Sequence, residues 1–82
     1  MNLCFVMGKI ISNIEFKFII NSKDISVSIF GIQLSNNSII TVKAYNEIAD
    51  FCYQKLVKGD IIMVYGKLNE KMEIVIQEID II

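Results

Sequence analysis

The chain has 82 residues, a net charge of −1 and a hydrophobic content of 54%. This length provides for one domain, residues 1–82, and for burial of only about 60% of its surface, so the surplus of apolar residues favours an oligomer interface. With this net charge, composition alone does not indicate a nucleic-acid-binding protein. All eight basic residues are lysines, and the absence of histidine removes the usual acid–base side chain near neutral pH.

The N-terminal part of the chain is rich in β-forming residues. Residues 2–12 carry apolar side chains on both faces of a strand, residues 15–20 form a second β-rich segment, and residues 21–24 form a polar turn. Only one face of the first strand can cover a core, so its other face needs a partner. We predict an oligomer interface centred on Leu3, Phe5 and Met7, or on their neighbours on the opposite face.

Two further strands form a predicted hairpin. Residues 25–35 begin with apolar side chains at every second position, until Gly31 marks a bulge or a sharp bend. Asn36 and Asn37 favour a tight turn, because asparagine tolerates positive φ. On the return strand, residues 38–45, one face is expected to cover the core and the other to carry Thr41, Lys43 and Tyr45.

A helix is predicted over residues 46–58. Asn46 is the expected N-cap, and Gly59 is the expected residue after the helix C-terminus. The expected apolar stripe consists of Ala49, Cys52 (or Tyr53) and Leu56. Residues 60–68 and 72–82 are the last two predicted strands, separated by a short turn.

We interpret the element order as three strands, one helix and two strands. This is the order of the OB-fold, an all-β, five-stranded Greek-key barrel with one helix between strands 3 and 4. Gly59 is expected to release the chain from helix to strand. Gly66 is expected to allow a strongly curved strand to bend around the barrel.

Specific residues carry a resemblance to a known family. The run "TVKAYNEIADFCYQKLVKGDIIMVYGKL", from Thr41 to Leu68, resembles the core of bacterial single-stranded DNA-binding proteins, whose helix ends in Leu-x-Lys-Gly and is followed by a strand with Val-x-Gly-x-Leu. The segments "NLCFVMGKI" and "EFKF" are similar to the family's N-terminal segments. The resemblance covers about residues 2–79 and implies a cytoplasmic homo-oligomer (dimer or tetramer) that binds single-stranded DNA in replication, recombination or repair.

The sequence also departs from the family's pattern. The tryptophans on which bases stack are absent, and the two loops that carry nucleic-acid contacts are shortened to "SNNS" and "NEK". The sequence stops at Ile82, so the family's acidic C-terminal tail is not in it. These departures predict weaker binding on the same fold.

Binding of single strands requires aromatic platforms for bases and positive charge along the backbone path. Tyr45 falls where the family places a base-stacking aromatic, beside Lys43 on the same strand face. Lys17 and Phe18 match the family's basic–aromatic pair, and Lys71 could close one side of the groove. The complete predicted nucleic-acid-binding set is Lys9, Lys17, Phe18, Thr41, Lys43, Tyr45, Lys67 and Lys71.

Nothing in the sequence indicates an enzyme. The nine carboxylates form no pairing motif, and no phosphate-binding loop, metal-ligand cluster or nucleophile–base motif occurs, so we expect no catalytic residue, metal, cofactor or small-molecule substrate. Cys4 and Cys52 are expected to be buried, reduced thiols of a cytosolic chain, and no membrane span is expected.

Three functions agree with the sequence. The first is the single-strand-binding module described above. The second is an OB-fold accessory that resembles primosomal replication protein N. The third is an OB-fold that binds proteins and has lost nucleic-acid binding, which the acidic balance and the missing tryptophans favour.

Overall fold

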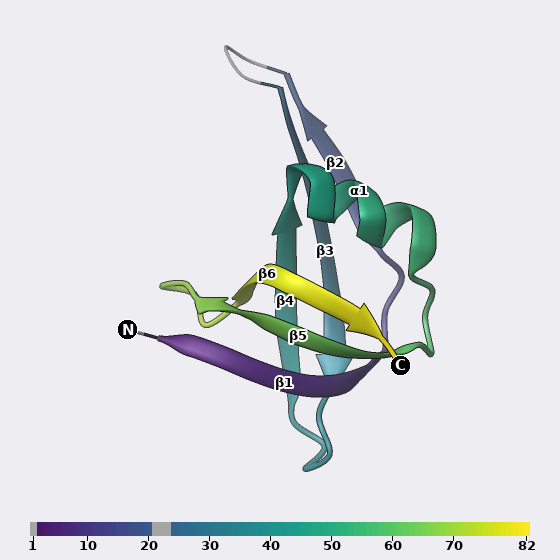
Figure 1. Cartoon of the computed structure of the whole chain (residues 1–82), viewed down its shortest axis with the longest axis vertical. Helices are drawn as coiled ribbons and strands as arrows, with labels where there is room; N and C mark the ends of the chain where they lie inside the picture. The colour runs from purple at the N-terminus through teal and green to yellow at the C-terminus, as the bar shows by residue number, and fades with distance from the viewer. Residues whose placement is uncertain (1, 21–23) are drawn as a thin grey trace.

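The computed structural model describes residues 2–20 and 24–82, so the turn predicted at residues 21–24 lies, apart from Asp24, outside the described residues. Within these described residues, six strands and one helix follow one another (Figure 1). They are β1 (Leu3–Ile10), β2 (Glu15–Ile19), β3 (Ile25–Gln33), β4 (Ile39–Tyr45), α1 (Asn46–Lys55), β5 (Ile61–Leu68) and β6 (Ile74–Ile81).

The strands form a closed barrel in the order β1-β5-β6-β4-β3-β2. All neighbours are antiparallel except β4 and β6, which are parallel, and β1 closes the barrel by pairing with β3 at Lys9 and Ile10. β1 pairs with β5 and, at its C-terminal end, with β3, and β2 continues the pairing with β3. Together, β1 and β2 therefore correspond to the first strand of a five-stranded barrel. The predicted OB-fold, with one helix between the third and fourth barrel strands, is confirmed.

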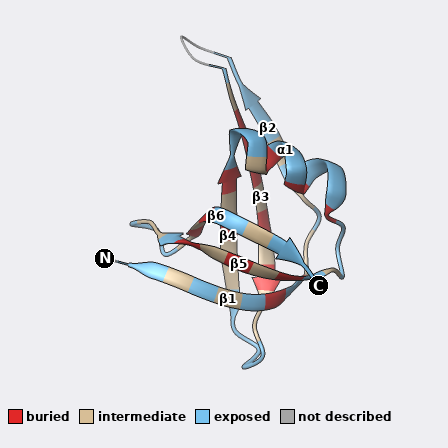
Figure 2. Ribbon diagram, in the orientation of Figure 1, coloured by how far each residue is buried: buried red, intermediate tan, exposed pale blue. Residues whose placement is uncertain are grey.

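The core lies between the barrel strands and under α1 (Figure 2). On β4, Val42 and Ala44 are fully buried and Lys43 and Tyr45 are not, as the alternation predicts. The helix buries Ala49 and Cys52, whereas Tyr53 is exposed, so Cys52 supplies the middle of the apolar stripe. The buried cluster consists of Ile10, Phe30, Ile32, Val42, Ala44, Ala49, Cys52, Leu56, Ile62, Val64, Ile74 and Ile76.

The predicted helix start is wrong in detail. β4 stays paired with β3 up to Tyr45, so Tyr45 and not Asn46 occupies the N-cap position. Within the described residues the N-cap has no side-chain hydrogen bond. Asn46 instead adopts a left-handed φ of 56°, which lets the chain turn from the strand directly into the helix.

The helix also ends earlier than predicted, at Lys55 and not at Lys58. The carboxylate of Asp60 accepts a hydrogen bond of 3.0 Å from the backbone N–H of Val57, and the N–H of Asp60 donates to the Val57 carbonyl. Because the chain is already extended at the C-cap residue Leu56, and this turn follows it, Gly59 is not the residue that follows the helix C-terminus. Gly59 still requires glycine, because its φ is 102°.

The two faces of β3 have different partners. Ser28 is fully buried, and its hydroxyl donates a hydrogen bond of 2.7 Å to the carbonyl of Ala49 in α1. The hydroxyl of Ser26 donates to the Asp50 carboxylate at 2.9 Å. The serine face of β3 therefore lies under the helix, and Val27 and Ile29 face the outside of the barrel.

The two cysteine thiols are free and differ in burial. Cys52 is fully buried, and desolvation raises its pKa to about 11, whereas Cys4 is only partly buried. The expectation that both thiols are buried is therefore correct for Cys52 alone. In the part of the chain that the structure describes, no helix has the length and apolar character needed to cross a membrane.

Candidate functional site

The outer face of β2, β3 and β4 brings together four of the eight predicted binding residues, Lys17, Thr41, Lys43 and Tyr45. Directly opposed residues on neighbouring strands share a face. Tyr45 on β4 is opposite Val27 on β3, and Val27 is opposite Lys17 on β2. The Tyr45 side chain is 41% exposed, while Val27 is only 6% exposed. An accessible ring and an ammonium group therefore flank an apolar floor.

Lys43 lies in the adjacent row of the same face. It is opposite Ile29 on β3 and Val75 on β6, and Val75 is opposite Lys67 on β5. Lys43 and Lys67 are thus two strands apart, which corresponds to about 10 Å across the sheet. The row of positive charge continues from β4 around the barrel to β5.

The far end of the same face carries Thr41 and Lys9. Thr41 is opposite Gly31, and Lys9 on β1 is opposite Gln33, which is in turn opposite Ile39 on β4. Ile39 is 64% exposed, although no role in binding was predicted for it. Its place in the period-two set with Thr41 was the signal that could have identified it.

Two predicted residues lie elsewhere. Phe18 is opposite Ser26, on the helix side of β2 and therefore on the other face from Lys17. Lys71 lies in the turn between β5 and β6, where it lines a shallow hollow together with Lys43 and Glu73. The structure thus places Phe18 apart from the outer face, and Lys71 at its border.

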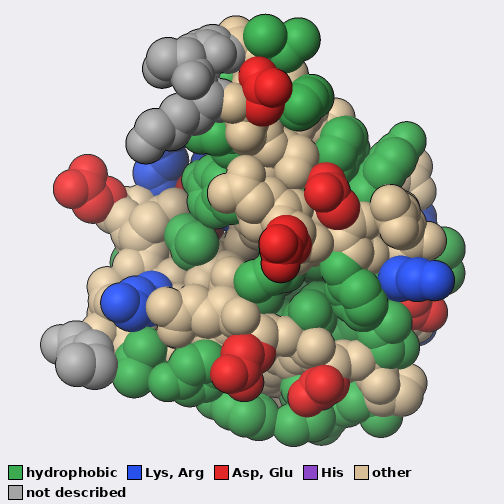
Figure 3. Space-filling view, turned by 45° about the horizontal axis from the view of Figure 1, so that its top comes forward, with side chains coloured by type: hydrophobic (Ala, Val, Ile, Leu, Met, Phe, Trp, Pro, Cys, Tyr) green, Lys and Arg blue, Asp and Glu red, His purple; other side chains and the backbone are tan. Residues whose placement is uncertain are grey.

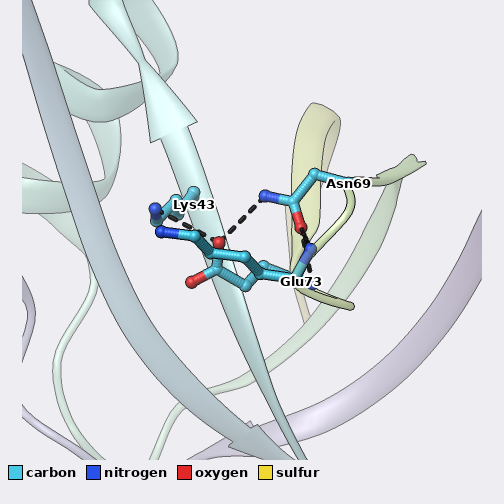
Figure 4. Close-up of polar contacts among 4 residues, drawn as sticks. Lys43, Asn69 and Glu73 are labelled. Atoms are coloured by element: carbon cyan, nitrogen blue, oxygen red, sulfur yellow. Dashed lines mark hydrogen bonds and ion pairs between the residues drawn. The ribbon is translucent and has the colours of Figure 1, made fainter.

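The ammonium of Lys43 is already paired. Its Nζ lies 3.2 Å from Oε1 of Glu73, and the side chains are only 20% and 17% exposed (Figure 4). Asn69 donates a hydrogen bond of 2.9 Å to the same carboxylate oxygen. The hydrogen bond from Asn69, followed by that from Lys43, lowers the pKa of Glu73, so the carboxylate is charged at neutral pH.

The second ion pair of the face is different in kind. Lys17 Nζ lies 3.3 Å from Oε1 of Glu15, and both side chains are 59% exposed. An exposed pair of this type contributes little to stability, about 0–1 kcal/mol, and exchanges readily with other ions. Lys17 is therefore available to a bound anion, whereas Lys43 must first leave a half-buried partner.

The predicted interface residues lie on the outer face of β1. Leu3, Phe5 and Met7 are 43%, 64% and 56% exposed. Across the sheet they are opposite Lys67, Tyr65 and Met63 of β5. Among the described residues, β1 pairs with β3 only at Lys9 and Ile10, so residues 3–8 form an apolar edge that is open on one side.

The side chains of this surface are suited to binding a ligand. It combines one accessible tyrosine, exposed aliphatic side chains and several lysines over neighbouring strands, which suits a chain of bases linked by phosphates. Sequence reasoning missed Glu73 and Asn69, which set the charge at Lys43. No local signal identifies them, because the contact depends on the parallel pairing of β4 with β6.

Comparison with protein-family models and with curated proteins finds no match. Among solved structures, the chain is similar to a single-stranded DNA-binding protein from Thermus aquaticus, with a TM-score of 0.87 and 20% identity. The match covers 100% of this chain and 40% of that protein, so this chain spans less than half of its length.

Two further structures give the same result. The SSB domain of a Synechococcus protein is similar with a TM-score of 0.84 and 15% identity, over 96% of this chain and 93% of that domain. The second single-stranded DNA-binding protein of Mycobacterium smegmatis is similar with a TM-score of 0.78 and 23% identity, over 98% and 87%. At these identities the comparisons establish the shared fold.

Proposed function

We propose that this chain binds single-stranded DNA through the outer face of β2, β3 and β4, without catalysis. The observation that carries the proposal is the row formed by Lys17, Val27 and Tyr45 on three neighbouring strands. A base can stack on the exposed ring of Tyr45 while a neighbouring phosphate meets Lys17. The OB-fold shared with single-stranded DNA-binding proteins supports the same proposal.

The path of the strand follows the distribution of lysines. From Tyr45 it runs past Lys43 toward Lys67 on β5, with Lys71 at the border. Thr41, Ile39 and Lys9 extend the face toward the other end of β4. Because the contacts are stacking and charge, without donors and acceptors arranged to read base edges, binding is expected to be sequence-tolerant.

A substitution at Tyr45 tests this proposal. Tyr45→Ala removes the stacking platform and is expected to cost about 1–3 kcal/mol of binding to a labelled oligo(dT) in fluorescence anisotropy. Lys43→Ala should weaken binding, because it leaves the Glu73 carboxylate unpaired beside the strand, but it should change the salt slope by much less than one unit, because Glu73 already balances the Lys43 charge. Circular dichroism should show that both variants are folded.

Tyr53→Ala is the matched control for this experiment. Tyr53 is 56% exposed on the helix, where its ring stacks on Phe16 at a centroid distance of 4.5 Å, away from the outer face. Its loss should leave the affinity for oligo(dT) unchanged. Equal effects of Tyr45→Ala and Tyr53→Ala would show that the outer face of β4 is not the binding site.

We also propose that the chain assembles through β1 into a homodimer or a tetramer built from dimers. The open edge at residues 3–8 and its exposed apolar side chains support this proposal. Figure 3 shows hydrophobic side chains exposed over several parts of the face in view, with carboxylates between them. Pairing of two first strands would cover this edge and join two sheets into one.

A further inference from the structure

The hollow beside Lys43 contains balanced charge. It is lined by Lys43 and Lys71, by the acidic side chains of Glu70 and Glu73, and by Asn69. Glu73 and Lys43 form the half-buried pair described above, and Figure 4 shows their side chains pointing toward each other. A phosphate that approaches Lys43 therefore meets a lysine whose charge is already neutralised.

The turn between β5 and β6 fixes Glu73 independently of Lys43. The side-chain oxygen of Asn69 accepts hydrogen bonds from the backbone N–H groups of Lys71 and Glu73, at 2.9 and 3.0 Å. The N–H of Asn69 donates to the Glu73 carbonyl at 2.9 Å, and the Asn69 amide nitrogen donates to the Glu73 carboxylate. Because these bonds hold the carboxylate in place, it does not need Lys43 to stay there.

We propose that Glu73 is a built-in competitor of nucleic-acid phosphate at Lys43 and thereby limits the affinity of the outer face. The inference rests on the proposed function, because it concerns the same binding face. The carboxylate occupies the position at the Lys43 ammonium that a backbone phosphate requires, so binding there is an exchange of one anion for another. Such an exchange releases little counterion, and the contact adds little to the salt dependence.

The exchange also favours long ligands. The interaction of a single phosphate with Lys43 is no more favourable than the existing interaction with the Glu73 carboxylate. A single phosphate is therefore not expected to displace Glu73. A strand that is already held at Tyr45, Lys17 and Lys67 brings its phosphate to Lys43 at high effective concentration. The acidic side chain thus makes the Lys43 contact conditional on the neighbouring contacts.

Glu73→Gln tests the inference against a matched control, Glu70→Gln. Both substitutions remove one negative charge from the same hollow, and the amide introduced by Glu73→Gln retains an oxygen that can accept the hydrogen bond from Asn69. Glu73→Gln should tighten binding of labelled oligo(dT) about fivefold at about 50 mM salt and steepen the salt slope by about 0.7. Glu70→Gln should change the affinity less than about twofold, because Glu70 makes no ion pair with Lys43 in the described structure.

A double-mutant cycle identifies the lysine through which Glu73 acts. In a Lys43→Gln background, Glu73→Gln should give no larger gain than Glu70→Gln. A gain that survives the loss of Lys43 would overturn the inference. Glu73→Ala provides the same charge change if the glutamine variant does not fold, as judged by circular dichroism.

The outcomes separate this inference from the proposed function. If wild type binds and Glu73→Gln binds no more tightly than Glu70→Gln, the competitor role is wrong and the proposed function stands. If wild type binds too weakly to detect and Glu73→Gln binds, the competitor role is supported. If neither binds oligo(dT), both are overturned.

Discussion

At the scale of single residues, the sequence identified several side chains of the outer face but not their ion-pair partners. The alternation on β4 correctly predicted that Lys43 and Tyr45 share a face opposite Val42 and Ala44. It could not reveal that Glu73 neutralises Lys43, because the two residues meet only through a parallel strand pair between distant segments. A lysine count along one strand therefore overestimates the charge that is free for phosphate.

The role of Gly66 also depends on a contact between strands that the sequence alone does not reveal. The sequence suggested that it lets a curved strand bend, whereas the structure reveals a close approach: a Cβ built on Gly66 would overlap the carbonyl oxygen of Val75. The register of β5 and β6 shifts between Tyr65 and Gly66. The glycine is required because the backbone of β6 occupies the space of a side chain.

This contact makes Gly66→Ala a strongly destabilising change. Since a backbone atom and not a flexible side chain blocks the methyl group, the free energy of unfolding should fall by about 3 kcal/mol, measured by chemical denaturation. Gly31→Ala is the control, because its Cβ would lie 3.6 Å from the nearest atom of Ile11, at ordinary contact distance. Similar losses in both variants would contradict the close approach as the cause.

At the scale of elements, the type and order of segments followed from the sequence, but their ends and orientations did not. The two-residue period of β3 indicates two faces without indicating which one is buried. The structure buries Ser26 and Ser28 because their hydroxyls bond with the first turns of α1. Val27 and Ile29, on the other face of β3, are thereby left to form the floor beside Tyr45 and Lys43.

The helix boundaries depended on partners that local signals do not contain. Asn46 has the residue type of an N-cap, but strand pairing up to Tyr45 decides where the helix begins. The helix ends where Leu56 becomes extended, and the turn between Val57 and Asp60 follows directly. Capping preferences contribute about 1 kcal/mol, which a continuous strand ladder easily overrides.

At the scale of the whole molecule, the exposed apolar edge predicts association. Phe5→Glu would place a charge on the exposed face of β1 and should yield monomers or insoluble protein, as measured by light scattering. Phe18→Glu is the control, because Phe18 is similarly exposed, at 55%, on the helix side of β2. Wild type that scatters as a clean 9.4 kDa monomer at micromolar concentration would contradict assembly through β1.

Binding of labelled oligo(dT) to the wild-type chain, measured over a range of salt concentrations, tests the central claim most directly. Three or four lysines lie on the path, and Lys43 is partly neutralised. We therefore expect measurable binding, with a slope of about −2 to −3 when the logarithm of the association constant is plotted against the logarithm of the salt concentration. A slope steeper than about −6 would require many more charges, supplied by several subunits on one strand. Absence of binding at low salt by the folded wild-type chain and by Glu73→Gln alike would contradict the claim and favour an OB-fold that recognises proteins.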